Sequence, residues 1–174
     1  MEKKYARFAT KKIQTDSIVD GEGIRSVIWF QGCSHNCPGC HNPETHDFNS
    51  GELVDLDEMK KQIDELEYQA GVTFSGGDPM MQVEALTELA AYVKSKGMNV
   101  WCYTGYTFEE IMKLSEKNDN YKKALEQIDV LVDGRFVMDL RSFDVQFRGS
   151  KNQRILDVAS SLKEGIAVKI DKYK

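Results

Sequence analysis

The chain alternates between short apolar runs and longer segments in which apolar residues recur at helical spacing. The short runs have the length and residue types of buried strands, and they cover residues 26–31, 71–75, 99–104 and 128–132. The longer segments predict helices at residues 56–70, 82–96, 108–117 and 121–127. Strands and helices thus alternate about every 25 to 30 residues, which is typical of repeated βαβ units and a parallel sheet.

Three of the predicted strands end in polar or glycine-rich turns, at Gly32-Cys33, Ser75–Asp78 and Asp133-Gly134. Ligands of parallel α/β folds bind at the carboxyl ends of the strands. A chain of 174 residues is too short for the eight units of a closed barrel. We therefore expect an α/β fold with a mainly parallel sheet, arranged as a partial, open β/α barrel in one domain over residues 1–174. The last twenty residues have weak periodicity and predict no defined element.

Composition narrows the class of protein. With 41% hydrophobic and 29% charged residues, the chain resembles ordinary globular proteins. Its net charge of −5 offers no electrostatic footprint for nucleic acid or an anionic membrane. No apolar stretch approaches the ~18 residues of a membrane span, and the first residues lack the apolar core of a secretion signal. We expect a cytoplasmic protein with neither a nucleic-acid nor a membrane partner.

Three of the four cysteines, Cys33, Cys37 and Cys40, lie within eight residues. Such clustering in a cytoplasmic chain indicates a metal centre rather than disulfides. Soft thiolate ligands suit either zinc or an iron–sulfur cluster. Structural zinc requires a fourth ligand, for which His35 and His41 are candidates, so a zinc-stabilised binding module stays open. A 4Fe-4S cluster held by three cysteines instead leaves one iron free to bind a ligand.

A second motif follows the strand at residues 71–75 and consists of Ser75, Gly76, Gly77 and Asp78. Paired glycines let backbone groups approach a ligand closely, and such groups can hold an amino-acid moiety. Asp78 is a candidate partner for an ammonium group. The same residues are also good turn formers, so a plain turn before a helix is the alternative interpretation.

Together these motifs resemble the radical S-adenosylmethionine superfamily and, within it, the activating enzymes of glycyl-radical proteins. The resemblance runs in order from about residue 16 to residue 158. It is carried, besides the cysteine motif, by Val19–Arg25, Gln31–Cys33, Cys40–Thr45, Ser75–Pro79, Tyr103–Tyr106, Asp129–Phe136 and Arg148–Arg154.

The resemblance implies an enzyme that uses a 4Fe-4S cluster and S-adenosyl-L-methionine. Cys33, Cys37 and Cys40 would bind three irons, and the amino and carboxylate groups of S-adenosylmethionine would bind the fourth. One electron from the reduced cluster would break a carbon–sulfur bond, giving methionine and a 5′-deoxyadenosyl radical. That radical would take a hydrogen atom from the Cα of a glycine in a partner enzyme.

The resemblance also assigns cofactor-binding residues, and no catalytic residue beyond the cluster and the cofactor. The methionine end would be held by Ser75, Gly76, Gly77 and Asp78. The cofactor beside the cluster would be lined by Gly39, Cys40 and His41. Asp133 and Arg135 would reach the carboxylate or the ribose, and Thr104 is a further candidate.

The implied partner is the large subunit of an anaerobic ribonucleoside-triphosphate reductase, with an electron donor such as flavodoxin. An activating enzyme of another glycyl-radical protein, such as pyruvate formate-lyase, is the alternative. The shortness of the chain and the segment Arg148–Arg154 argue against this alternative.

Overall fold

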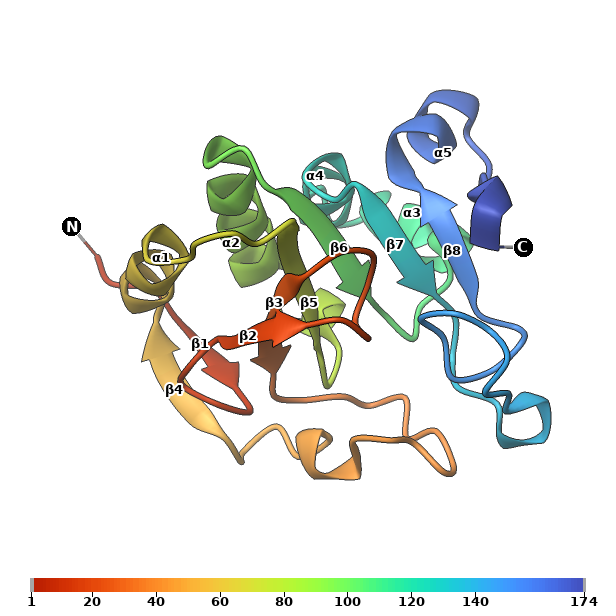
Figure 1. The fold of residues 1–174 in the computed structure, drawn as a ribbon, viewed down its shortest axis with the longest axis horizontal. Coiled ribbons are helices and arrows are strands. Elements are labelled where there is room, and N and C mark those ends of the chain that lie inside the picture. Colours follow the sequence, from red (N-terminus) through yellow and green to blue (C-terminus); the bar gives the residue numbers. More distant parts are fainter. Residues whose placement is uncertain (1, 174) are drawn as a thin grey trace.

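The computed structural model describes residues 2–173, which fold around one sheet of eight strands (Figure 1). The strands are β1 (Tyr5–Phe8), β2 (Gln14–Ser17), β3 (Arg25–Phe30), β4 (Glu52–Asp55), β5 (Gly71–Gly76), β6 (Asn99–Tyr103), β7 (Val130–Asp133) and β8 (Arg154–Asp157). They are arranged in the order β4-β1-β3-β5-β6-β7-β8, and β2 pairs with β3 beside this row. The four strands predicted from apolar runs are β3, β5, β6 and β7, which are neighbours at the centre of the sheet.

The sheet is mixed, which corrects the expectation of a mainly parallel sheet. The neighbouring pairs among β3, β5, β6 and β7 are parallel. The pairs that involve β1, β2, β4 and β8 are antiparallel. These outer strands have four residues each, of which at most two are buried apolar residues, so they give no apolar run in the sequence.

The helices are α1 (Leu56–Asp64), α2 (Val83–Ser95), α3 (Phe108–Ser115), α4 (Asn120–Glu126) and α5 (Val158–Glu164). The four predicted helices are confirmed, although α1 is shorter than expected. It ends at Asp64 because the following residues turn back toward β5, with Tyr68 in a left-handed conformation at φ 57°. Helix α5 lies in the C-terminal stretch for which the sequence predicted no element.

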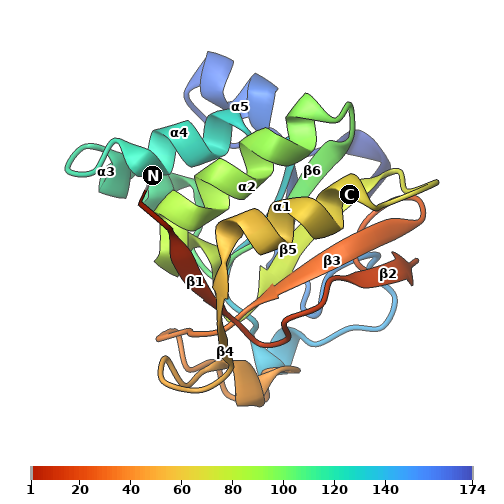
Figure 2. The same ribbon diagram turned by 90° about the vertical axis from the view of Figure 1, so that its left-hand side faces the viewer.

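The helices gather on one face of the sheet (Figure 2). The main core lies between them and the sheet, because alternate strand residues such as Ile28, Phe74 and Val100 point to this face and pack with helix residues such as Leu86 and Leu89. Each fully buried side chain of this kind contributes roughly 1.5–3 kcal/mol. A second, smaller cluster lies on the open face and contains Trp101, Val132, Ile155 and Tyr173.

None of the helices described in residues 2–173 is long and apolar enough to cross a membrane.

Candidate cluster and cofactor site

A cavity of about 560 Å³ lies where the four central strands end. Its wall includes Trp29 of β3, Ser75 and Gly76 of β5, Tyr103 of β6, and Gly134 immediately after β7. The volume falls within the ~300–1,000 Å³ range of small-molecule sites. The cavity therefore occupies the position that the turns in the sequence predicted for a ligand.

The cysteine loop follows β3 and forms one side of the cavity. Cys33, Cys37 and Cys40 all line it, and each is a half-buried free thiol. In residues 2–173, no three His, Cys, Asp or Glu side chains are grouped closely enough to hold a single metal ion. Three soft sulfur donors around a roomy cavity instead fit a group of the size and chemistry of an iron–sulfur cluster.

Hydrogen bonds from the start of the cysteine loop to the segment that follows it fix the loop. The backbone N–H of Gly32 donates to the carbonyl of Thr45 at 2.7 Å, and that of Cys33 donates to the carbonyl of His46 at 3.1 Å. The buried Gln31 side chain donates to the carbonyls of Glu44 and Asp47 at 3.0 and 2.8 Å. The loop is thus held at its base before any ligand binds.

Burial raises the pKa of the Cys33 thiol to about 11, and the nearby Asp78 carboxylate acts in the same direction. Hydrogen bonding by the backbone amide of His35 acts against this rise. A thiol with so high a pKa carries its proton at neutral pH. Because iron is bound by the thiolate, loading of the cluster releases this proton.

The Gly-Gly turn after β5 packs directly against the base of the cysteine loop. The N–H of Gly77 donates to the carbonyl of Phe30 at 2.8 Å, and that of Asp78 donates to the carbonyl of Gly32 at 2.9 Å. A Cβ atom on Gly77 would collide with the Gly32 backbone. Gly77 is therefore required by this close approach, which brings the two predicted motifs to one cavity.

The Asp78 carboxylate has no exposed surface and is surrounded by partners from this chain. Its Oδ2 atom accepts hydrogen bonds from the Thr104 hydroxyl at 2.9 Å and the Gly105 N–H at 3.0 Å, and lies 2.6 Å from Nε2 of His35. Its Oδ1 atom accepts from the Met80 N–H at 3.0 Å. Asp78 is absent from the cavity wall. Both carboxylate oxygens thus have partners within this chain, and the expected ion pair of Asp78 with an ammonium group stays a prediction.

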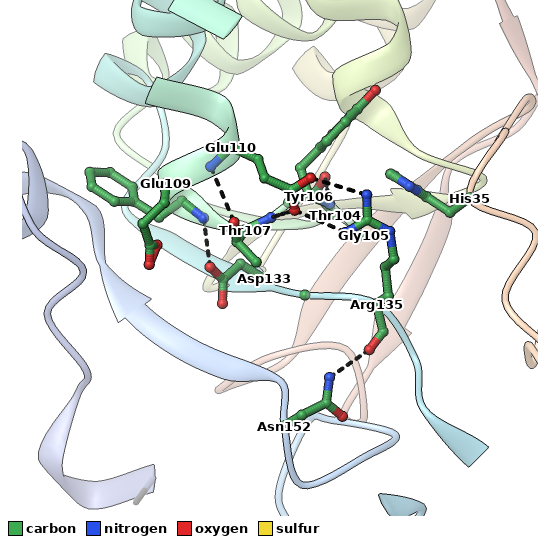
Figure 3. Close-up of polar contacts among 12 residues, drawn as sticks. His35, Thr104, Gly105, Tyr106, Thr107, Glu109, Glu110, Asp133, Arg135 and Asn152 are labelled. Atoms are coloured by element: carbon green, nitrogen blue, oxygen red, sulfur yellow. Dashed lines mark hydrogen bonds and ion pairs between the residues drawn. The ribbon is translucent and has the colours of Figure 1, made fainter. Parts of the chain in front are cut away.

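Asp133 also lies outside the cavity wall. Its carboxylate accepts the Phe108 N–H at the start of α3 at 2.7 Å (Figure 3) and forms an ion pair with Arg154 at 2.5 Å. Both of its oxygens thus have partners in this chain, and the expected contact of Asp133 with a carboxylate or ribose stays a prediction. Its role in the structure is to join the start of α3 to β8.

Arg135 is likewise absent from the cavity wall. Its guanidinium donates to both carboxylate oxygens of Glu110, at 2.9 and 3.1 Å (Figure 3). The neighbours Gly134 and Phe136 line the cavity in its place. The assignment of Arg135 to the cofactor stays a prediction, and at this strand end the small and the aromatic residue line the cavity.

Of the remaining predicted residues, some line the cavity and one does not. Cys40, His41 and Thr104 line the cavity. Gly39 does not, and it lies against Met138 with a φ of 75°. The ring of His41 packs against Phe136, with ring centroids 5.2 Å apart.

Sequence reasoning missed much of the aromatic wall, which includes Trp29, Tyr103, Phe136, Phe143 and Phe147. Trp29 and Tyr103 stand at strand ends, and their strand positions predict that they face away from the helices. Tyr103 donates its hydroxyl hydrogen to the Phe147 carbonyl at 2.7 Å. The segment that carries Phe143 and Phe147 is irregular, so it has no periodicity from which its place could be inferred.

Comparison with known proteins gives consistent results. Residues 19–156 match the family model described as a 4Fe-4S single cluster domain. Anaerobic ribonucleoside-triphosphate reductase-activating proteins of Salmonella typhimurium and Escherichia coli are 36% and 35% identical to the chain, and each match covers 78% of the chain and 90% of the relative. The protein of the same name from Enterobacteria phage T4 is 33% identical over 83% of this chain and 90% of the relative.

Among solved structures, QueE from Escherichia coli is similar with a TM-score of 0.47 and 16% identity, over 59% of this chain and 54% of that chain. At the level of the family, the matches confirm the expected enzyme class and the expected 4Fe-4S cluster and S-adenosylmethionine. They do not support a zinc-stabilised module. The chain belongs to the 4Fe-4S single cluster domain family and, within it, to the anaerobic ribonucleoside-triphosphate reductase-activating proteins.

Proposed function

We propose that this protein activates an anaerobic ribonucleoside-triphosphate reductase by generating a radical on a glycine of the reductase's large subunit. One observation carries the proposal: the cysteine loop after β3 and the Gly-Gly turn after β5 line the same cavity. The cysteine loop supplies three soft thiolate ligands. The Gly-Gly turn supplies backbone groups that can approach a ligand closely. The family to which the chain belongs points to the same reaction.

In this proposal Cys33, Cys37 and Cys40 hold three irons of a 4Fe-4S cluster. The backbone of Ser75, Gly76 and Gly77 holds the methionine end of S-adenosylmethionine. When bound, the reduced cluster would supply the one electron needed to cleave S-adenosylmethionine, so that methionine and 5′-deoxyadenosine form and the hydrogen atom that completes the 5′-deoxyadenosine comes from the target glycine. An external one-electron donor, such as flavodoxin, restores the reduced state.

The aromatic wall excludes water from the reacting groups. Trp29, Tyr103, Phe136 and Phe147 place apolar ring surface around the cavity. Burial holds the pKa of Tyr103 well above its ordinary value, so its hydroxyl stays neutral and keeps its hydrogen bond to the Phe147 carbonyl. An apolar wall whose tyrosine hydroxyl keeps its proton protects a reactive intermediate from water and from side reactions.

The proposal also includes the fold, which we describe as an open, partial β/α barrel. The parallel strands β3, β5, β6 and β7 form its wall, and the cavity lies at their carboxyl ends. Because one sheet runs through the described residues, we also propose that residues 1–174 act as one radical S-adenosylmethionine domain.

The test is a reaction in the absence of oxygen. The protein is reconstituted with iron and sulfide, reduced and mixed with S-adenosylmethionine, and 5′-deoxyadenosine is measured by chromatography. The large subunit of the reductase is then added, and a glycyl radical is sought by electron paramagnetic resonance. We expect both products, with the glycyl radical on the reductase and none on pyruvate formate-lyase as the control partner.

Two results would contradict the proposal in different ways. If cluster-loaded protein forms no 5′-deoxyadenosine even with the reductase present, the radical reaction is wrong. If 5′-deoxyadenosine forms but the glycyl radical arises only on pyruvate formate-lyase, the partner is wrong.

Replacement of one cysteine tests the ligand assignment. We expect Cys37→Ala to lose both cluster iron and 5′-deoxyadenosine formation, because two thiolates remain on the loop. Iron content and the visible absorbance of the reconstituted protein measure the loss. Cys102→Ala is the matched control, since Cys102 is buried in the core on the helix face and should leave iron content unchanged. Turnover in the Cys37 variant would contradict the assignment.

A further inference from the structure

The Asp78 carboxylate joins three loops that follow neighbouring strands. Asp78 itself follows β5, Thr104 and Gly105 follow β6, and His35 belongs to the cysteine loop after β3. The two other loops contact the same carboxylate oxygen, Oδ2: Thr104 and Gly105 at 2.9 and 3.0 Å, and His35 at 2.6 Å. A buried carboxylate with this many donors is well satisfied and holds its partners in one geometry.

His35 is the member of this group that comes from the cysteine loop. It lies between Cys33 and Cys37, and its side chain is only 5% exposed. Its ring packs edge-on against Tyr106, with centroids 4.6 Å apart. In Figure 3 the His35 ring lies beside the Thr104-Gly105 turn. A Cβ atom on Gly105 would lie 2.5 Å from Cδ2 of His35, so the glycine makes room for the ring.

Few other side-chain hydrogen bonds connect this loop to the rest of the described chain, although Gly39 lies against Met138 and His41 packs against Phe136. Within the described part of the segment 34–40, the side-chain hydrogen bonds to other parts of the chain come from His35 and from Ser34, whose hydroxyl lies 3.4 Å from the Met81 sulfur. The strong backbone bonds to the Gly-Gly turn are at the base of the loop, at Phe30 and Gly32. The contact of His35 with Asp78 is therefore the shorter of the two, and it joins the segment between Cys33 and Cys37 to the Gly-Gly turn.

We propose that His35 is a positioning residue that, through Asp78, holds the cluster-binding loop at a fixed separation from the cofactor-binding turn. The inference rests on the proposed function, because it concerns how two halves of that site are aligned. S-adenosylmethionine has to reach the open iron and the Gly-Gly turn at the same time. A displacement of about 1 Å between such partners lowers reaction rates about 100-fold.

The test compares variants of the full chain after anaerobic reconstitution. His35→Phe keeps a ring against Tyr106 and loses the hydrogen bond, whereas His35→Gln keeps a donor near Asp78. Ser34→Ala is the control in the same loop. The readouts are iron and sulfide content, the electron paramagnetic resonance signal of the reduced cluster as S-adenosylmethionine is titrated in, and the yield of 5′-deoxyadenosine.

We expect His35→Phe to bind iron and sulfide like the wild type. The S-adenosylmethionine concentration needed for the half-maximal change in the signal should rise about ten- to a hundred-fold, as for the loss of a charge-assisted hydrogen bond. The 5′-deoxyadenosine yield should fall with it. His35→Gln should recover part of both readouts, and Ser34→Ala should match the wild type.

Three outcomes would overturn the inference. A wild-type titration curve in His35→Phe would show that the contact does not align the site. Loss of the cluster in both His35 variants would show that the residue serves cluster binding rather than alignment. A wild-type protein whose signal does not respond to S-adenosylmethionine would overturn the proposed function itself, and with it the inference. The first two outcomes leave the proposed function intact.

Discussion

Arg25 is a fully buried cation at the start of β3. It donates to the Thr73 hydroxyl at 2.8 Å and to the carbonyls of Val72 and Asn99 at 3.1 and 3.4 Å, and it lies 5.5 Å from the centre of the Trp101 ring. Burial lowers its pKa to about 10, so it stays charged at neutral pH. These contacts join the first residues of β3 and β6 to β5, at the end of the sheet opposite the cavity.

We expect Arg25→Lys to destabilise the protein by about 1–3 kcal/mol, because one ammonium group cannot reach acceptors that a planar guanidinium serves together. Urea unfolding followed by circular dichroism measures the difference. Arg7→Lys is the control, since the Arg7 guanidinium makes one long hydrogen bond at the surface, 3.5 Å from the Ser50 carbonyl. Equal stability of the Arg25 variant and the wild type would contradict this expectation.

At the scale of elements, helix α3 begins with a reciprocal cap. The Thr107 hydroxyl accepts the Glu110 N–H, and the Glu110 carboxylate accepts the Thr107 N–H. The same carboxylate pairs with Arg135, which lowers the pKa of Glu110 to about 2. One glutamate thus connects the start of α3 to the segment that follows β7.

This lowered pKa predicts how the stability contributed by Glu110 depends on pH. The ordinary pKa is 4.5 and the folded one about 2, so the contribution is complete above about pH 4.5 and is lost as pH falls toward 2. We expect Glu110→Gln to be less stable than the wild type by under about 1 kcal/mol at pH 6, because the pair is partly exposed, and by much less at pH 3. Urea unfolding of metal-free protein at both pH values provides the measurement. An unchanged difference at pH 3 would refute the assignment, and Glu126→Gln at the exposed end of α4 is the control.

The elements that could be predicted from sequence are those with enough apolar residues to set a period. Strands β3, β5, β6 and β7 are buried and contain continuous apolar runs, so they were found. Strand β2, with the sequence Gln-Thr-Asp-Ser, buries one of its four residues and is held in place by β3. Its structure depends on tertiary pairing, which a local pattern does not contain.

The site residues differ in the same way: some depend on a local sequence pattern, and others depend on tertiary contacts. The cysteines could be proposed as ligands from the sequence, because their chemistry depends on spacing within one loop. The role of Asp78 was not found, because His35 and Thr104 reach its carboxylate from segments 43 and 26 residues away. A side chain at a glycine-rich turn looks available for a ligand until the partners that surround it are known.

For the molecule as a whole, three aromatic residues close the open face of the sheet. Trp101, Phe147 and Tyr173 pack edge to face, with ring centroids 5.4 to 6.0 Å apart. The Tyr173 hydroxyl donates to Glu22 at 2.6 Å, and its carbonyl accepts from Arg148 at 2.7 Å. Residues far apart in the sequence thereby hold the segment of Phe147 and Arg148, which forms part of the cavity wall.

Removal of Tyr173 should therefore loosen one face of the molecule selectively. We expect Tyr173→Ala to cost about 3 kcal/mol of stability, as for other large aromatic truncations. Amide hydrogen exchange should accelerate in residues 141–149 while it stays nearly unchanged in α2. Tyr173→Phe keeps the ring contacts and should resemble the wild type. Equal acceleration in α2 would show that the two faces unfold together.

The larger apolar cluster lies on the face of the sheet away from the cavity, and it contains most of the buried apolar side chains. The cavity rim includes residues such as Val19 and Phe143, which are 70% and 87% exposed. Substitutions at such positions remove little buried area, so they leave folding nearly unchanged. The rim residues can therefore change during selection for a different protein partner, because the apolar core on the helix face still stabilises the fold.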